Sequence, residues 1–302
     1  MCFDKFKEMK IYAICISLAF FGLLVSCNSA DSIKQYAATE SYPNDTILRI
    51  ISSKRALIVI AHDDDMCAIA GTASLLNKAG WEIGVLSLER SPDRDAAHIK
   101  ACRSILDTVM FVDLSPEQIR NDSEAERARY YAFPKDSIDL IFNRSVVEAA
   151  YLQSIQAFNP TVLFSLDNEM GGYGNPEHVL ISQLVLDLAL SKRIQAKYIY
   201  QSVYTDHMEN TIMARHAKRM KSWGFPGDEW DNAKRIYGVS GMPEPSIQIK
   251  IESEAEEKMA YLRSYNKRER KTLGFFVPEF ESYDAQTYFR IFNREFYRVI
   301  EL

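Results

Sequence analysis

Short apolar runs separated by amphipathic stretches mark the chain from about residue 55 to residue 203. Five such runs have the length and the Val, Ile and Leu content of strands buried on both faces of a parallel sheet. They cover residues 56–60, 83–88, 109–112, 161–166 and 197–203. Between them, apolar residues recur at helical spacing over residues 67–78, 94–106, 136–157 and 179–190. This alternation predicts an α/β fold with right-handed crossovers.

The remaining pattern is consistent with one domain. Residues 116–134 form a charged excursion that is predicted to be helical, and residues 246–251 alternate polar and apolar as an edge strand does. The aromatic-rich residues 285–299 are predicted to form the last helix. We therefore expect a single Rossmann-like domain over residues 46–302, with an open, mainly parallel sheet and helices on both faces.

A cluster of polar residues follows the first of these strands. His62, Asp63, Asp64 and Asp65 come directly after Ala61, where the chain turns toward a helix. Ligands of open α/β sheets bind at this carboxyl edge. Helix capping accounts for one or two carboxylates at such a turn, but not for three together with an imidazole. From these four residues alone, a metal or acid–base site and a capping cluster both stay open.

A second strand-to-helix turn carries another histidine. Residues 161–166 lead into a glycine-rich loop and then into Asn175-Pro176-Glu177-His178. Because parallel strands end at one edge of the sheet, His62 and His178 are expected to converge there. Two imidazoles and a carboxylate suit Zn²⁺ with a free position for water, and Fe²⁺ fits the same ligands. In a tight turn, one of Asp64 and Asp65 can bind the metal while the other acts as a base.

Two further polar side chains follow strands at the same edge. His207 comes after residues 197–203 and is a candidate for an acid or a substrate contact. Arg90 comes after residues 83–88 and can bind a hydroxyl or an anionic group of a substrate. A surface salt bridge is the alternative role for Arg90, as it is for Arg94.

The two histidine motifs resemble those of the PIG-L/LmbE-type N-deacetylases. The first, Ala61-His62-Asp63-Asp64-Asp65, is similar to the family's A-H-P-D-D-E signature, and Asn175-Pro176-Glu177-His178 is similar to its H-x-D-H motif. The resemblance runs from roughly residue 54 to residue 300. It implies a zinc-dependent hydrolase that removes the acetyl group from an N-acetylated amino sugar or glycoconjugate, so the expected partner is a small molecule or a glycan.

The resemblance also implies roles for individual residues. By position, the metal ligands are His62, Asp65 and His178, and the general base is Asp64. Asn175 replaces the first histidine of the second motif; it can donate a hydrogen bond to an oxyanion but cannot act as an acid near neutral pH. Residues 87–91, which include Arg90, and Tyr265 stand where the family contacts its substrate.

The N-terminus is typical of an exported protein. Three lysines precede the apolar residues 11–25, a run too short for a comfortable membrane span. Leu24-Val25-Ser26-Cys27 resembles a lipobox, which implies that Cys27 is acylated; an ordinary cleaved signal or a single-pass anchor is the alternative. The expected organisation is a signal peptide over residues 1–27, a tether over residues 28–45 and the domain beyond.

Charge and composition narrow the function further. The chain of 302 residues is 25% charged with a net charge of −5, which gives no reason to expect nucleic-acid binding. We expect a lipoprotein of the bacterial cell envelope that meets the membrane only through its lipid anchor. Besides the deacetylase, the sequence allows a catalytically weak sugar-binding lipoprotein of the same fold, which Asn175 favours, or a hydrolase of another amide.

Overall fold

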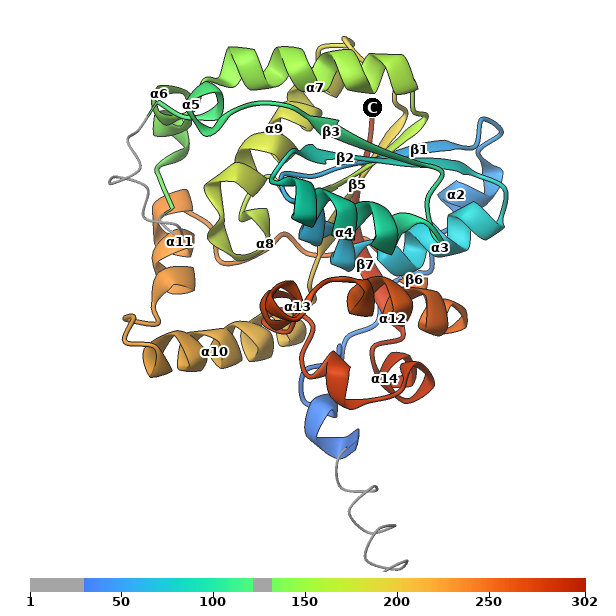
Figure 1. The fold of residues 1–302 in the computed structure, drawn as a ribbon, viewed down its shortest axis with the longest axis vertical. Coiled ribbons are helices and arrows are strands. Elements are labelled where there is room, and N and C mark those ends of the chain that lie inside the picture. The colour runs from blue at the N-terminus through green and yellow to red at the C-terminus, as the bar shows by residue number, and fades with distance from the viewer. Residues whose placement is uncertain (1–29, 122–131) are drawn as a thin grey trace, which may run out of the picture.

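The computed structural model describes residues 30–121 and 132–302 (Figure 1). Two of the expected regions lie outside the described residues. They are the predicted signal peptide with Cys27, and residues 122–131 of the charged excursion. Within them the chain forms a seven-stranded sheet of order β3-β2-β1-β4-β5-β7-β6. No helix in these two segments is long and apolar enough to cross a membrane.

The sheet is parallel except at one edge. Its parallel strands are β1 (Arg55–Val59), β2 (Glu82–Leu88), β3 (Thr108–Val112), β4 (Val162–Leu166) and β5 (Tyr198–Val203). Strand β7 (Arg294–Glu301) pairs antiparallel with β5 and with the edge strand β6 (Ile247–Lys250). The predicted fold class is confirmed, including the five parallel strands and the edge position of residues 246–251.

The continuous apolar runs arise because both faces of the sheet are covered. In β1 and the residues after it, Ala56, Ile58 and Ile60 enter one core, while Leu57, Val59 and Ala61 enter the other. The first core is closed by α3 (Ala70–Lys78), α4 (Pro92–Cys102), α12 (Ala255–Ser264) and α14 (Ala285–Ile291). The second is closed by α7 (Arg144–Phe158), α9 (Pro176–Leu190) and α11 (Glu229–Tyr237). Figure 1 shows α7 on one side of the sheet and α3, α4, α12 and α14 on the other.

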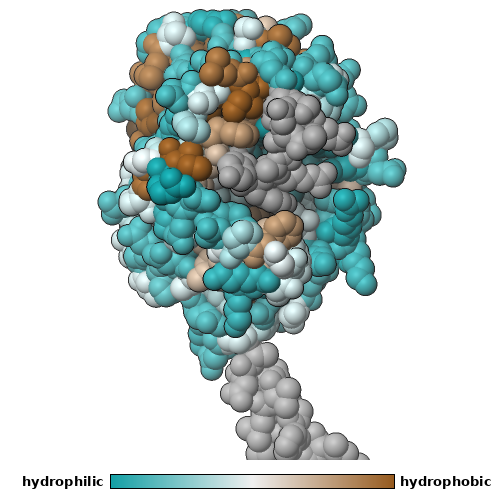
Figure 2. All heavy atoms as spheres, turned by 90° about the vertical axis from the view of Figure 1, so that its left-hand side faces the viewer, coloured by the Kyte–Doolittle hydropathy of each residue, from teal (hydrophilic) through white to brown (hydrophobic). Residues whose placement is uncertain are grey.

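The other described helices connect these layers. They are α2 (Ile47–Ile50), α5 (Pro116–Ile119), α6 (Ile138–Ile141), α8 (Gly171–Gly174), α10 (Asp206–Ser222) and α13 (Lys267–Leu273). Four 3-10 turns complete the list: η1 (Asp63–Ala68), η2 (Lys135–Ser137), η3 (Glu252–Glu254) and η4 (Phe280–Ser282). On the face that Figure 2 shows, apolar residues form small separate patches in a mainly hydrophilic surface, as on other globular proteins.

Two helix predictions were wrong. The predicted last helix ends at Ile291, and residues 294–301 form β7, whose backbone pairs on both sides with β5 and β6. The predicted helix over residues 136–157 is broken between α6 and α7. At the break Phe142 is extended, pairs with Arg120 in an isolated bridge and buries its ring in the second core.

Residues 30–45 do not behave as the tether that we expected over residues 28–45. Ile33 is buried in the first core, and Asn44 forms a bridge with Gln248 beside β6. The Tyr200 hydroxyl donates to the buried carboxylate of Asp45 at 2.7 Å. The packed part of the described chain therefore begins before residue 46, because a few side chains of this polar segment fit into the domain.

Candidate metal and catalytic site

The first polar turn is a short 3-10 helix at the carboxyl end of β1. His62 is extended and precedes η1, and its backbone N–H donates to the Asp65 carboxylate at 2.9 Å. This local hydrogen bond places the imidazole and the Asp65 carboxylate on the same side of the turn. The turn itself thus prepares two of the expected ligands.

The structure brings the three predicted metal ligands together. Atoms of His62, Asp65 and His178 that can bind a metal all lie within 4.8 Å of one another. His178 Nε2 lies 2.8 Å from His62 Nδ1 and 3.1 Å from Asp65 Oδ1. The ring of His178 is buried and comes from the first turn of α9, which starts at the same sheet edge as η1.

The His62 and His178 rings each form a hydrogen bond through the nitrogen that points away from the site. This bond determines whether the other nitrogen can bind a metal. His62 Nε2 donates to the Glu177 carboxylate at 2.6 Å, and His178 Nδ1 donates to the carbonyl of Gly171 at 3.0 Å. When both rings are neutral, the inner nitrogens carry the lone pairs and face the Asp65 carboxylate, so that a cation would meet three ligand atoms. Such a set fits a divalent cation, and outer-shell acceptors of this kind orient metal-binding histidines.

Glu177 is a site residue that the sequence analysis missed. Its carboxylate lies 3.3 Å from Arg90 and 3.8 Å from Arg120, so two cations hold it against His62. An acid in the first turn of a helix is ordinarily explained by the helix dipole, which is why its position gave no signal. Arg90, predicted to bind substrate, is placed behind His62 and is ion-paired there.

A buried aspartate shapes the loop that supports His178. The carboxylate of Asp167 accepts the backbone N–H groups of Glu169, Met170, Gly171 and Gly172 at 2.6–3.2 Å. Gly171 and Gly172 have positive φ values of 60° and 74°, a conformation that costs glycine little. The loop thereby aims the Gly171 carbonyl at the His178 ring. Asp167, too, was missed by the sequence analysis.

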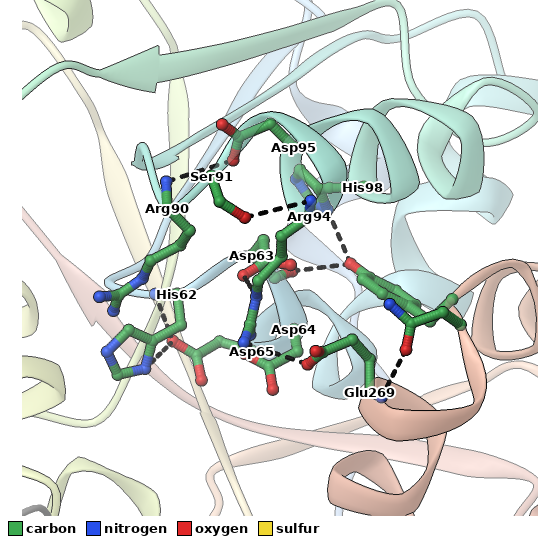
Figure 3. A network of polar contacts seen from close by, with 12 residues as sticks. His62, Asp63, Asp64, Asp65, Arg90, Ser91, Arg94, Asp95, His98 and Glu269 are labelled. Atoms are coloured by element: carbon green, nitrogen blue, oxygen red, sulfur yellow. Dashed lines mark hydrogen bonds and ion pairs between the residues drawn. The ribbon is translucent and has the colours of Figure 1, made fainter.

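Arg94 holds two of the carboxylates of the first turn (Figure 3). It contacts Asp64 at 2.7 Å, Asp63 at 2.6 Å and Glu269 of α13 at 3.1 Å. Burial raises the pKa of Asp64, while the charge of Arg94 opposes that rise. Burial also raises the pKa of Asp63 to about 7, with a further contribution from the neighbouring Asp64. Asp64 and the ligand Asp65 both face the pocket described below.

Asn175 serves as the N-cap of α9. Its side-chain oxygen accepts the backbone N–H of Glu177 at 2.8 Å, and its amide group donates to the Tyr173 hydroxyl at 3.5 Å. The residue is only 9% exposed. In this arrangement the side chain stabilises the helix that carries His178.

Two residues expected to bind substrate lie elsewhere. Tyr265 is 1% exposed, and its hydroxyl lies 2.9 Å from His98 and 3.3 Å from the carbonyl of Asp63, so it supports the first turn from inside the core. His207 begins α10 and donates from Nε2 to the carbonyl of Gln35 at 2.9 Å. It faces the N-terminal segment because that segment packs on the domain.

An open pocket with a cavity volume of about 90 Å³ lies beside the candidate ligands. One end is formed by Asp64, Asp65 and His178, and most of the remaining wall is apolar or aromatic. A mainly apolar pocket that ends on titratable side chains has the lining that is typical of a small-molecule site. The candidate ligands and the candidate base therefore share one accessible space.

No protein-family model and no curated protein matches the chain in sequence. Solved structures do match it. GalB, the 4-carboxy-2-hydroxymuconate hydratase from Pseudomonas putida KT2440, is 14% identical over 82% of this chain and 97% of its own, with a TM-score of 0.48. The teicoplanin deacetylase Orf2, described in a zinc-inhibited form, is 13% identical over 82% and 98%, with a TM-score of 0.47.

A third solved structure is the N,N'-diacetylchitobiose deacetylase from Pyrococcus horikoshii. It is 12% identical over 84% of this chain and 89% of its own, with a TM-score of 0.42. These three solved structures are thus two deacetylases and one hydratase. At 12–14% identity these likenesses concern the fold.

Proposed function

We propose that this protein is a metal-dependent hydrolase that removes the acetyl group from an N-acetylated amino sugar or glycoconjugate. One observation carries the proposal: the acceptor set of His62, Asp65 and His178 points inward, with Asp64 beside it at the end of an open pocket. Zn²⁺ suits two imidazoles and one carboxylate, and Fe²⁺ is compatible with the same ligands.

The chain's own residues divide the proposed reaction. A zinc ion held by these three ligands would polarise an amide carbonyl and acidify a water molecule. Asp64 accepts the proton of the attacking water and returns it to the departing amine nitrogen. Burial raises the pKa of Asp64 and makes its carboxylate more basic, while Arg94 opposes that rise and orients the carboxylate through a contact at 2.7 Å. Asn175 can assist the oxyanion only by exchanging its long contact with Tyr173 for the substrate.

The alternative is a catalytically weak sugar-binding protein of the same fold. Asn175 favours it, because an amide can donate a hydrogen bond but supplies no acid, and its oxygen is already used to cap α9. Losing one oxyanion donor lowers the rate about 10²–10³-fold, which would leave slow hydrolysis. A binding protein would show no turnover at all, so measuring turnover distinguishes the two functions.

The test combines metal content with acetate release. We expect the zinc-loaded protein to release acetate from at least one member of a panel of N-acetylated sugars. The Asp64→Ala variant should keep its zinc and lose about 10²–10⁴ in turnover. Asp139→Ala, which changes an exposed aspartate of α6, is the matched control and should behave as the wild type.

The outcomes of that test separate the hypotheses. Stoichiometric zinc without acetate release from any sugar would favour the sugar-binding alternative or another amide. A zinc-free Asp64→Ala protein would contradict the division of roles between Asp64 and Asp65. Failure of the wild type to take up zinc or iron would overturn the metal site.

We also propose that Cys27 is acylated and holds the protein at the bacterial cell envelope. The supporting observation is the apolar run that ends in Leu24-Val25-Ser26-Cys27. Cells labelled with a palmitate analogue should incorporate it into the wild type but not into a Cys27→Ser variant. Equal labelling of the two proteins would rule out this anchor.

A further inference from the structure

The pocket beside the candidate metal site has little that would recognise a sugar. Among the described residues, the only charged or imidazole side chains in its lining are Asp64, Asp65 and His178, and no described lysine or arginine belongs to it. Most of the wall consists of larger apolar and aromatic residues, which are Leu166, Tyr173, Val203, Tyr204, Met213, Met242, Leu273 and Phe276. Sugar hydroxyls need polar partners, whereas such a wall favours an apolar group.

The aromatic part of this wall starts at a metal ligand. The ring of Tyr173 lies 5.3 Å from that of His178, edge to face, and stacks on Phe276 at 4.4 Å. The Tyr204 hydroxyl donates to the backbone carbonyl of Phe276 at 3.0 Å, so its polar atom is turned to the protein. The aromatic rings of the wall therefore form a continuous apolar surface that begins at His178.

A second pocket adjoins this wall and shares six lining residues with the first, among them Tyr204 and Phe276. Its cavity volume is about 70 Å³, and its lining also contains the charged residues Lys258, Arg294 and Glu295. Its own wall adds further aromatic side chains, including Tyr288, Phe289 and Phe296. The apolar space next to the ligands is therefore larger than the first pocket alone.

The other side of the ligand cluster is charged. His62 contacts Glu177 through Nε2, and Glu177 contacts Arg90 and Arg120. The side chains of these three residues are 11–29% exposed, and none of them lines the apolar pocket. The cluster therefore lies between a charged region and an apolar one, an arrangement that suits an amide joining a polar half to an apolar half.

We propose that the pocket binds the acyl half of the substrate and that it accepts, besides acetyl, a medium-length alkyl or aryl acyl group, which it favours. The proposal rests on the amide hydrolysis proposed above and specifies its substrate class. The amine product is an ammonium ion at neutral pH, which an apolar pocket would desolvate at a high cost. The carboxylic acid product would keep its carboxylate at the ligand cluster, and only its alkyl or aryl group would be buried in the pocket.

The first experiment varies the chain length of the acyl group. The zinc-loaded protein is given glucosamine N-acylated with acetyl, butanoyl, hexanoyl or octanoyl, and the release of the free amine is measured. We expect kcat/KM to rise about twofold to fourfold for each methylene that enters the pocket. A parallel series of N-acetylated alkylamines should show no such rise; a rise in that series alone would overturn the acyl assignment.

A pair of variants on α13 tests whether the gain arises in this pocket. Thr272 lines the pocket, whereas its neighbour Lys271 is exposed and does not. Thr272→Trp should fill the space and lower the octanoyl-to-acetyl ratio of kcat/KM at least tenfold. Lys271→Trp introduces the same side chain one residue away and should leave the ratio unchanged. Equal ratios in all three proteins would overturn the proposal.

A binding measurement separates this proposal from the hydrolase proposal. Calorimetric titration of the metal-free and zinc-loaded protein should show octanoate binding at least tenfold more tightly than acetate, with the difference lost in Thr272→Trp. Acetyl hydrolysis without any chain-length preference would overturn the acyl pocket and leave the hydrolase. Chain-length-dependent binding without hydrolysis of any amide would support the pocket and overturn the hydrolase, and failure of both readouts would overturn both.

Discussion

The first polar turn shows how adjacent aspartates acquire different roles. Asp65 turns back to bond the backbone of His62 and joins the ligands, while Asp64 faces the pocket and pairs with Arg94. Asp63 is fully buried, and one of its carboxylate oxygens has no hydrogen-bond partner among the described residues. Side-chain direction within a single 3-10 turn, not residue type, thus separates the candidate ligand, the candidate base and the structural acid.

At this scale we predict that Glu177 controls metal affinity. Glu177→Gln removes the charge that accepts the His62 Nε2 proton, so the inner nitrogen becomes a weaker donor to the metal. We expect the zinc dissociation constant to rise about tenfold or more. Competition titration with a chromogenic chelator measures it, and Asp187→Asn, a change in the same helix but near Arg144, is the control. Equal affinity in both variants would contradict this role.

A second prediction concerns His98. It is fully buried against Tyr265, Cys102 and Phe111, and burial together with the charge of Arg94 lowers its pKa to about 4. The unfolded chain takes up this proton below about pH 6.5, but the folded protein does so only near pH 4, so the folded state loses stability as the pH falls between these values.

The size of the loss follows from the shift in pKa. It amounts to about 3 kcal/mol over that window, at 1.36 kcal/mol per pH unit. Urea unfolding at pH 7.5 and pH 4.5 should show a smaller loss for His98→Gln than for the wild type. An equally steep loss in both proteins would mean that another group causes the acid instability.

At the scale of elements, Arg94 joins three parts of the fold that are distant in sequence. It extends from α4 to the carboxylates of η1 and to Glu269 in α13 (Figure 3). The turn that supplies His62 and Asp65 is therefore fastened to helices on the first core. A buried aspartate needs this partner because its charge has lost its water.

We predict a strong coupling between Arg94 and Asp63. Arg94→Met leaves the buried Asp63 without its cation and should lower the free energy of unfolding by about 2–4 kcal/mol. The double variant Asp63→Asn/Arg94→Met should be closer to the wild type than the sum of the two single changes. Urea denaturation of the four proteins gives the coupling, and additive losses would show that the pair acts independently.

At the scale of the whole molecule, the N-terminal segment is part of the packed domain. The carboxylate of Glu40 accepts from the hydroxyl of Thr205 at 2.7 Å and from the backbone of His207 at 2.7 Å, at the start of α10. Together with the buried Ile33, these contacts connect residues 30–45 to the edge of the sheet. Any lipid anchor at Cys27 would therefore be separated from the folded domain by only a few residues.

This arrangement predicts different costs for two isoleucines. Ile33→Ala removes a fully buried side chain and should cost about 2–5 kcal/mol of stability. Ile50→Ala removes a side chain that is 79% exposed and should cost no more than about 0.5 kcal/mol. Thermal and urea unfolding of both variants provides the comparison. Two neutral substitutions would mean that residues 30–45 behave as a free tether.

The sequence by itself determined the parallel sheet and the convergence of the ligands. Continuous apolar runs occur only where both faces of a strand are covered, and parallel strands end at one edge, so His62 and His178 had to meet there. These conclusions depend on the periodicity of apolar residues and on the order of strands and helices, and both can be read from the sequence. The local turn then brought Asp65 to the same place.

Only the tertiary structure decided which partner each remaining side chain meets. Residues 294–301 became a strand because β5 and β6 offered hydrogen bonds on both sides, and residues 30–45 packed because the sheet edge accepted them. Tyr265 and His207 left the site for the same reason: one is enclosed by the core and the other faces the N-terminal segment. Distant contacts of this kind leave no periodic trace in the sequence.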